Sequence, residues 1–536
     1  MDLPMNIYFW VLCIVPIVLL IVLLVGFQWS ALKAAFVTLI VTIIIGMGFF
    51  RATFLVIGIE LLRASWSSIS IILVIISAIF LYEVSDEANA FNTLNHFFKT
   101  VAPNELVRIL LIGVVFASFL QGVTGFGVPI LVTAPLLIQI GLKPVWAVVI
   151  PLIGHSWAGT FGTLAIAWKA LLEQIVATQN DFANHTAFFA GIFLFILTFA
   201  ANFFIVYQYG KSKALMKGFI AIVVITVIQG GGQLYLSQIN PELAAFLPSA
   251  CALGALILLS KSPLYKEEWA LQHSKIMREK SFKVGETKET ETKTMSTFQA
   301  LIPYLLMTIL TLTVLLITPL YKFLNQFSYG PNLIETVTGY GVVNEAVESY
   351  SPITPFTHAG MFLFLAAFAS YLYYKNKGFV KSPHAMKYII TRTIKRAISP
   401  SIAVLVLLAI SRVMAGTGQT IILAEGITNV LGPYYILVAP FIGLLGSFIT
   451  GSNMSSNILF GGFQYLTAEF IGANTSLIVG AQTAGGAIGM AFAPGNIILG
   501  TSATGTLGLE GKVMVKIIPF TLVVAIIFAL LLFFIS

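Results

Sequence analysis

Two charge-free stretches inside long apolar segments constrain the fold of this chain more than any other feature. One runs from Phe119 to Pro129 and the other from Phe448 to Asn457, and both interrupt apolar sequence with glycine and small polar residues. Hydrocarbon cannot hydrogen bond the backbone groups that a broken helix leaves free, so such backbone lies at membrane depth only where protein or a water-filled cavity surrounds it. A pair of interrupted segments, one in each half of a chain, is typical of a carrier's binding site.

The composition places the chain in the lipid bilayer. Of its 536 residues, 58% are hydrophobic and 9% are charged, against about 25% charged in an average soluble domain. The first apolar run, residues 7–27, is long enough to span, and no small-residue cleavage site follows it, so we expect a permanent helix rather than a signal peptide. The chain is therefore expected to be an all-α polytopic membrane protein.

The net charge of +8 does not indicate a nucleic-acid partner. The lysines and arginines lie mainly in short loops and in one hydrophilic segment, which is the pattern that orients a membrane protein. Only Cys13 and Cys251 are present, both in apolar surroundings, so they indicate neither a disulfide framework nor a cysteine metal site. We expect no nucleic acid, no bound metal and no cofactor.

The apolar runs predict about 12 to 14 transmembrane helices at roughly 20 residues each. The hydrophilic segment divides them into three parts: an N-terminal transmembrane repeat (1–259), a cytoplasmic loop (260–297) and a C-terminal transmembrane repeat (298–536). This loop and the basic loops at 211–217 and 375–381 agree on one topology by the positive-inside rule. Counting back from them places the N-terminus outside the cell.

One segment makes the side of the membrane on which the N-terminus lies depend on whether that segment spans. Residues 52–66 carry Glu60 and Arg63 at helical i, i+3 spacing within apolar surroundings. An ion pair on one face of a helix lowers the cost of charge at membrane depth, and this is the interpretation that we favour for the two residues.

The two interrupted stretches resemble one another. Aligning Gly122 with Gly451 gives Phe-x-x-Gly in both halves, followed by small and polar residues and then by an apolar stretch. His155 lies 33 residues after Gly122 and Gln482 lies 31 residues after Gly451, and each opens a polar, glycine-rich run. Because proline stops helices and glycine permits close approach and positive φ, each half is expected to hold a broken helix and a second glycine-rich helix.

Broken helices offer a site for a small carboxylate. A half-helix N-terminus that points into a cavity presents free N–H groups and a partial positive charge. The alternative is that the small residues only allow helices to pack closely. The clusters at 121–124 and 452–457 carry more hydrogen-bonding groups than packing needs. Both interpretations stay open for Gly159, Gly162, Gly485, Gly486 and Gly489.

Two ionisable residues are candidates for a role in transport. Neither motif contains an acid, so His155 is the titratable side chain at hand for proton coupling, since histidine can load and release a proton near physiological pH. A neutral histidine hydrogen bonded between helices is the alternative. Arg412 could hold an anionic substrate, or its side chain could reach the interface near the end of a span.

The other classes of membrane protein fit the sequence less well. A channel would more often show short subunits, a filter motif or charged rings. An enzyme would need paired acids or a cluster of histidine, acid and metal at depth, and the motif regions contain neither. An ATP-driven pump would need a phosphate-binding loop, which is absent from the sequence. We therefore expect a carrier, not an enzyme.

Three motifs, taken in order, resemble those of the L-lactate permease family. They are Gln121 to Pro129, Thr450 to Asn457 and Gln482 to Gly486, and the likeness runs over almost the whole chain. The resemblance implies a cell-membrane symporter that moves lactate or glycolate with protons and is built from two inverted-topology repeats. The partners it implies are a small organic anion of the 2-hydroxy monocarboxylate class, and protons.

The sequence departs from the family pattern at four places. The family usually has Glu where Gln121 stands, Asp where Asn453 stands, Asn at or beside His155, and Lys at or beside Met490. Both motif acids and a nearby base are therefore missing. Either the coupling proton takes another path, such as one through His155, or the substrate differs.

The prediction that follows is a midplane site between the two breaks of a secondary carrier. A carrier of another small solute with a different coupling ion is the main alternative, and a channel is a weaker one. His155 is the proton-coupling candidate. The substrate-binding candidates are Gln121, Gly122, Thr124, Gly125, Gly127, Ser156, Gly451, Ser452, Asn453, Ser455, Ser456, Asn457, Gln482, Thr483 and Arg412.

Overall fold

The computed structural model describes residues 3–23, 27, 29–175, 180–271, 273–278, 295–380 and 382–536, so much of the predicted loop 260–297 lies outside the described residues. Nearly all regular structure is helical, as predicted. The helices of the first part are α1 (Ile7–Ile21), α2 (Ala31–Gly48), α3 (Phe54–Glu87), α4 (Ala90–Val101), α5 (Glu105–Leu110), η2 (Leu111–Phe116), α6 (Ala117–Val123), α7 (Val128–Gln139), α8 (Pro144–Gly154), η3 (Ser156–Gly159), α9 (Gly162–Leu172), α10 (Asn180–Ile225), η4 (Thr226–Gly231), α11 (Gly232–Leu236), η5 (Pro241–Leu243) and α12 (Phe246–Ser260).

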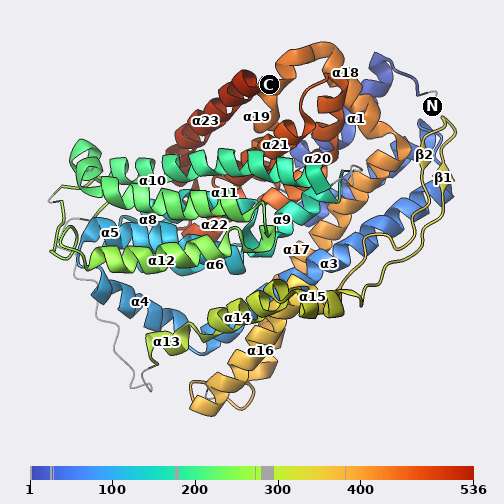
Figure 1. Cartoon of the computed structure of the whole chain (residues 1–536). Coiled ribbons are helices and arrows are strands. Elements are labelled where there is room, and N and C mark those ends of the chain that lie inside the picture. The colour runs from blue at the N-terminus through green and yellow to red at the C-terminus, as the bar shows by residue number, and fades with distance from the viewer. Residues whose placement is uncertain are drawn as a thin grey trace.

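The second part adds one small antiparallel hairpin, in which β1 (Thr336–Val337) pairs with β2 (Val343–Asn344). This hairpin lies at the right-hand edge of Figure 1. The helices of this part are α13 (Thr297–Ala300), α14 (Ile302–Leu316), α15 (Thr318–Asn325), η6 (Pro355–Thr357), α16 (Ala359–Lys377), α17 (Ala385–Thr417), α18 (Gln419–Leu431), η7 (Gly432–Tyr434), α19 (Tyr435–Thr450), α20 (Asn453–Phe470), α21 (Thr475–Gly489), α22 (Pro494–Ala503) and α23 (Glu510–Ile535).

The described residues hold eight helical stretches long and apolar enough to cross a membrane, or nine if α14 and α15, which meet at 88°, form one bent span. Five further apolar helices are shorter, and three of these, α7, α8 and α9, lie beside the predicted breaks. A multi-pass membrane protein is thus confirmed. The count of 12 to 14 spans stays a prediction, because it depends on which of the short helices cross the membrane.

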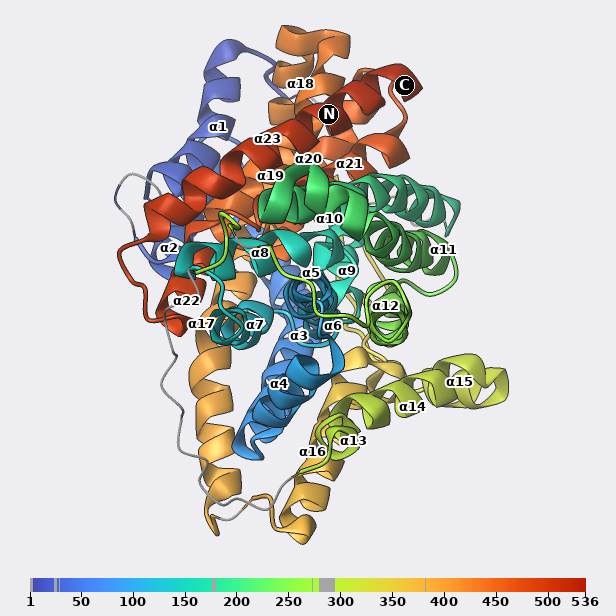
Figure 2. The same ribbon diagram turned by 90° about the vertical axis from the view of Figure 1, so that its left-hand side faces the viewer.

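Two long helices connect the parts. The segment 52–66, which was ambiguous in the sequence, belongs to α3, a 34-residue helix that Thr53 caps by accepting a hydrogen bond from Val56 N at 3.3 Å. α3 packs along α17, and both run diagonally through Figure 1. In Figure 2, turned by 90°, α5, α7 and α12 are seen end-on, so these helices run roughly across the view of Figure 1.

The sequence predicts spans at the apolar runs 144–168, 186–208 and 214–229, and the observed helices divide differently. The apolar run 144–168 is not one span, because the chain turns at 155–161 and separates α8 from α9. The runs 186–208 and 214–229 were expected as separate spans, and α10 contains a kink between them at Gly210 and Lys211, where φ reaches −164° and +50°. Hydrophobicity located these segments, whereas their breaks follow from local backbone geometry.

The order of elements around the two motifs recurs. In the first half α6 ends at the break, and α7, α8, α9 and α10 follow it; in the second half α19 ends at the break, and α20, α21, α22 and α23 follow. Both breaks contain glycine with positive φ, +55° at Gly125, +82° at Gly127 and +78° at Gly451. The predicted broken helices are therefore confirmed, while the inverted relation of the two halves stays a prediction.

Glycines hold α19 and α21 together at close range. A Cβ atom on Gly485 would lie 2.1 Å from the carbonyl oxygen of Pro440, and one on Gly489 would lie 2.2 Å from that of Leu444. Gly443 of α19 faces the carbonyl oxygen of Gln482 in the same way, at 2.1 Å. Helix packing through small residues, one of the two interpretations left open, accounts for these glycines.

We expect Gly485→Ala to destabilise the fold, because the added methyl group meets backbone that cannot move without separating α19 from α21. The expected loss is about 1–3 kcal/mol of unfolding free energy, measured from the thermal unfolding of the detergent-solubilised protein by tryptophan fluorescence. Gly254→Ala is the control, because nothing lies within 4 Å of a Cβ atom there. Equal stability of the two variants would contradict the packing role.

Candidate functional site

Three half-helices beside the motifs begin without a side-chain cap. They are α7, α20 and α22, whose N-cap residues Gly127, Ser452 and Ala493 accept no hydrogen bond through a side chain from the first turn. The first residues of α20, Asn453 to Ser455, are buried. The partial positive charge at a helix N-terminus therefore lies in a low-dielectric region at the second break.

Four buried side chains join the two halves at this point. Asn453 Nδ2 donates to Thr160 Oγ1 at 3.2 Å and to Thr483 Oγ1 at 3.3 Å, and the two threonine hydroxyls lie 3.1 Å apart. Asn457 Nδ2 donates to Thr483 Oγ1 at 2.9 Å and to the Ala167 carbonyl at 3.0 Å. We call Thr160, Asn453, Asn457 and Thr483 the polar cluster. It contains no charged side chain.

The polar cluster keeps unused hydrogen-bonding capacity. The Oδ1 atoms of Asn453 and Asn457 and the hydroxyl of Ser447 are buried and have no hydrogen-bond partner among the described residues. A Cβ atom on Gly486 would lie 2.0 Å from Asn453 Oδ1 and 3.0 Å from Ser447 Oγ, so this glycine leaves room for the amide. Ser447, which the sequence analysis did not single out, therefore lies beside the cluster.

Two predicted site residues hold the helices of the second half together. Gln482 Nε2 donates to Ser456 Oγ at 3.1 Å, and Ser456 Oγ donates to the Gly443 carbonyl at 2.8 Å. Gln464, which the sequence analysis missed, donates to Gln482 Oε1 at 2.9 Å and to the Ala439 carbonyl at 2.9 Å. Ser456 and Gln482 thus have partners in the protein and fix α20 against α19 and α21.

The first break lies against α9 and α22. The Thr163 hydroxyl donates to the Gln121 carbonyl at 3.5 Å, and the Gln121 side chain is buried. Thr124 Oγ1 donates to the Leu120 carbonyl at 2.8 Å, within its own helix. A Cβ atom on Gly127 would lie 2.5 Å from Leu499 Cδ1 of α22, so the break of one half packs on a short helix of the other.

Several other candidates lie in or near the breaks. Gly122 packs on α12, where an added Cβ atom would lie 2.7 Å from Phe246 Cα. The Ser156 hydroxyl donates to the Ile153 carbonyl at 2.8 Å. Ser452 is half-buried beside Gly451, and Ser455 is buried in the first turn of α20.

An asparagine that sequence reasoning missed connects the break at Gly451 with the C-terminal end of α21. Asn496 Nδ2 donates to the Gly451 carbonyl at 3.1 Å and to the Met490 carbonyl at 2.8 Å. Its position two residues after Pro494, at the start of α22, was the signal available in the sequence. The bonds fix the end of α19 to the end of α21.

His155 lies at the turn between α8 and η3. Its side chain is 4% exposed, and Nδ1 is buried without a hydrogen-bond partner among the described residues. The backbone of the same turn is held by a bond from His155 N to the Pro151 carbonyl at 3.0 Å. Among the described residues, Nδ1 therefore makes no hydrogen bond to another helix, and the role of His155 in proton coupling stays a prediction.

Arg412 has a partner that the sequence did not reveal. Its Nε donates to Glu60 Oε2 at 3.2 Å, and Arg63 Nη1 lies 3.4 Å from Glu60 Oε1, which confirms the predicted pair on α3. Both guanidinium groups lie 5.7 Å from the ring centre of Tyr350. The protein itself therefore supplies Arg412 with a carboxylate, and its predicted contact with a substrate anion stays a prediction.

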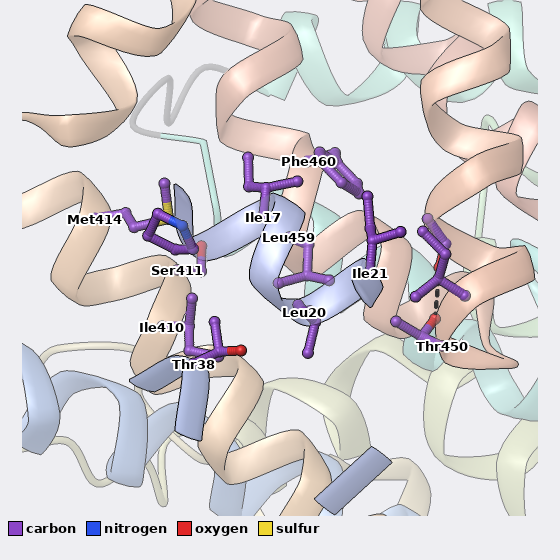
Figure 3. Close-up of a pocket in the computed structure, with 13 residues that line it drawn as sticks. Ile17, Leu20, Ile21, Thr38, Ile410, Ser411, Met414, Thr450, Leu459 and Phe460 are labelled. Atoms are coloured by element: carbon purple, nitrogen blue, oxygen red, sulfur yellow. Dashed lines mark hydrogen bonds between the residues drawn. The ribbon is translucent and has the colours of Figure 1, made fainter. Parts of the chain in front are cut away.

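A small cavity lies beside the second break, between α1, α2, α17, α19 and α20 (Figure 3). Most of its lining is apolar, and its polar members are Thr38, Ser411 and Thr450. Figure 3 shows Thr450 hydrogen bonded within this group, which is the 2.8 Å bond from its hydroxyl to the Gly446 carbonyl. None of the predicted substrate-binding residues lines this cavity. The polar cluster is therefore packed between the halves rather than exposed to this cavity.

One solved structure resembles the fold weakly. It is described as the crystal structure of the Alcanivorax borkumensis YdaH transporter, and it matches 88% of this chain and 86% of its own chain at a TM-score of 0.44 and 12% identity.

Comparison of sequences gives a stronger relation. The chain is 26% identical over 504 residues to an L-lactate permease of Halalkalibacterium halodurans, covering 92% of this chain and 91% of the relative. It is also 26% identical over 543 residues to the glycolate permease GlcA of Escherichia coli K12, covering 96% and 93%. The sequence profile of the family described as L-lactate permease matches residues 10–536. The chain therefore belongs to the L-lactate permease family.

Proposed function

We propose that the protein is a secondary active transporter that moves lactate, or a related 2-hydroxy monocarboxylate such as glycolate, across the cell membrane together with protons. The observation that carries the proposal is the uncapped, buried N-terminus of α20 beside the polar cluster. Free N–H groups and the helix dipole attract a carboxylate there, and no acid of the cluster competes with it. The names of the lactate and glycolate permeases among its relatives agree with this substrate class.

The polar cluster fits the second functional group of such a substrate. A 2-hydroxy acid carries a hydroxyl group next to its carboxylate, and that hydroxyl needs an acceptor. The Oδ1 atoms of Asn453 and Asn457 are acceptors without a partner among the described residues. The proposed pose therefore directs the carboxylate to the start of α20 and the hydroxyl to an asparagine oxygen.

A different solute is the second candidate, and the neutral residues Gln121 and Asn453 favour it. Where the family pattern has acids, this chain has amides. A different coupling ion, or a substrate of different charge, would account for the change at these two positions. In this case the same breaks would line the site, and the coupling ion would differ.

The test is uptake of labelled L-lactate into proteoliposomes, with and without an inward proton gradient. We expect gradient-driven uptake in the wild type and its loss, by at least about fivefold, in Asn453→Ala, because leaving the substrate hydroxyl buried without its acceptor costs about 1–3 kcal/mol. Loss in His155→Ala as well would assign proton coupling to this histidine. His185→Ala, an exposed histidine on α10, is the matched control.

The outcomes separate the two candidates. Uptake that persists in His155→Ala and fails in Asn453→Ala would keep the site and move the proton path elsewhere. A correctly folded wild type without lactate uptake would contradict the lactate proposal and favour the carrier of another solute.

A further inference from the structure

A groove lies on the surface between the starts of α8 and α23, away from the polar cluster. It has a volume of about 800 Å³ and includes Lys143, Trp146, Lys512, Val515 and Lys516 in its lining. The three lysines are exposed, whereas Trp146 is 8% exposed and lies at the buried side of the lining. The groove therefore combines an apolar floor with basic residues at its rim.

The groove is basic. Among the residues that the structure describes, its lining contains three lysines and no acidic residue. The nearest acid in the sequence is Glu510, and its carboxylate already accepts hydrogen bonds from Gly508 N at 2.8 Å and from the Thr501 hydroxyl at 2.8 Å. Lys143 Nζ donates to the Lys275 carbonyl at 2.9 Å, which orients the side chain and leaves two further N–H donors.

One helix N-terminus adds to this positive potential. α8 begins at Pro144, so its first turn borders the groove, whereas the first turn of α23 carries the carboxylate of Glu510. The partial positive charge of a helix N-terminus attracts anions. Together with the lysines, it gives the groove the character of a phosphate site rather than that of a general apolar surface.

The groove lies where an aqueous segment meets a membrane helix. Residues 273–278 of the hydrophilic segment pair with 141–143 through bonds from Lys143 N to the Ile276 carbonyl and from Arg278 N to the Gly141 carbonyl, both at 2.8 Å. α23 is one of the helices able to cross the membrane, and Lys512 and Lys516 lie in its first two turns. Lysine and tryptophan at the end of a membrane helix are typical of the headgroup region.

We propose that this groove binds an anionic phospholipid, with the phosphate between Lys143, Lys512 and Lys516 and the start of an acyl chain along Trp146 and Val515. An amphipathic ligand fits both parts of the lining, because the lysines match the headgroup and the apolar floor matches the chain. A free anion would use only the lysines. The proposal does not depend on the transported substrate.

The test is titration of the full-length, detergent-solubilised protein with phosphatidylglycerol and with phosphatidylcholine, read by native mass spectrometry. We expect tighter binding of phosphatidylglycerol, weakened about thirtyfold in the double variant K512Q/K516Q, because each lysine near an anionic headgroup contributes roughly fivefold. K387Q/K395Q on α17 is the control with the same change of charge at exposed lysines outside the groove. Thermal unfolding of each variant verifies that it is folded.

Other results would overturn the proposal. Equal binding of the two lipids, or an equal loss in the control pair, would show that general surface charge is responsible. Displacement of bound phosphatidylglycerol by inorganic phosphate at equal concentration would assign the groove to a free anion. A K512Q/K516Q variant that unfolds would be replaced by K143Q alone, for which about fivefold weaker binding is expected.

Discussion

Asn453→Asp will lower lactate uptake at neutral pH by at least about tenfold while leaving the protein folded. Aspartate has the shape of asparagine, and the hydroxyls of Thr160 and Thr483, which now accept from Nδ2, can donate to a carboxylate instead. The family pattern pairs an aspartate here with a lysine at or beside Met490, and this chain lacks that lysine. Without the nearby base, the new negative charge would repel a substrate carboxylate at the N-terminus of α20. At about 5 Å and an effective dielectric constant of about 20, that repulsion is about 3 kcal/mol, and half of it already gives a tenfold loss.

The uptake of this variant should depend on pH in a definite direction. Acid protonates the new carboxyl group and removes the repulsion, so the ratio of variant to wild-type uptake should rise as the pH falls from about 7 to about 4, the ordinary pKa of aspartate. Taking the ratio cancels the proton dependence of the wild type. Asn474→Asp is the matched control, because Asn474 caps α21 at an exposed position where aspartate caps equally well. Unchanged uptake by the Asn453 variant at neutral pH would separate this residue from the substrate path.

The breaks in the helices were predictable because their causes are local. Gly125, Gly127 and Gly451 adopt positive φ, a backbone conformation that glycine reaches without a Cβ penalty, and Pro129 follows the first two closely in the sequence. The turn at His155 was less visible, because the apolar run 144–168 continues through it. Hydrophobicity reports burial in the membrane, not the path of the backbone.

The partners within the site were harder to predict because they are distant in the chain. Thr160 lies in the glycine-rich run that His155 opens, yet only the packing of α20 near α9 brings it to Asn453, 293 residues away. Gln464 lies within α20, where one more polar residue on a helix gives no signal of its partner. The sequence thus predicted which segments meet, whereas the side chains that bridge them depend on helix rotation.

The same limit applies to Arg412. Its neighbours in the sequence are apolar or small, which left a substrate anion or an interface as its possible partners. Glu60, 352 residues away, is within hydrogen-bonding distance because α3 and α17 pack along one another. The pairing between long helices, and not the local sequence, decides the surroundings of this arginine.

Glu60→Gln should be the most destabilising single substitution considered for this protein, with a loss of about 3–5 kcal/mol of unfolding free energy. Glu60 is 1% exposed and is in contact with two guanidinium groups, those of Arg63 and Arg412. An amide keeps the shape but not the charge, so the buried Arg63 and the half-buried Arg412 would both lose this carboxylate. Glu173 lies near Arg412, so Arg412 keeps a second acidic neighbour when Glu60 is replaced. Most of the lost stability should therefore come from Arg63.

A double-mutant cycle tests whether the loss comes from the unpaired charge. Unfolding of the detergent-solubilised protein is measured for Glu60→Gln, Arg412→Gln and the double variant, with Glu345→Gln in the exposed hairpin as a control expected to stay within about 0.5 kcal/mol of the wild type. We expect the double variant to be more stable than the sum of the single losses predicts, by about 1–3 kcal/mol, because removing Arg412 relieves one buried charge. Strict additivity would show that Glu60 and Arg412 do not stabilise one another, and the contact between α3 and α17 would then depend on apolar packing alone.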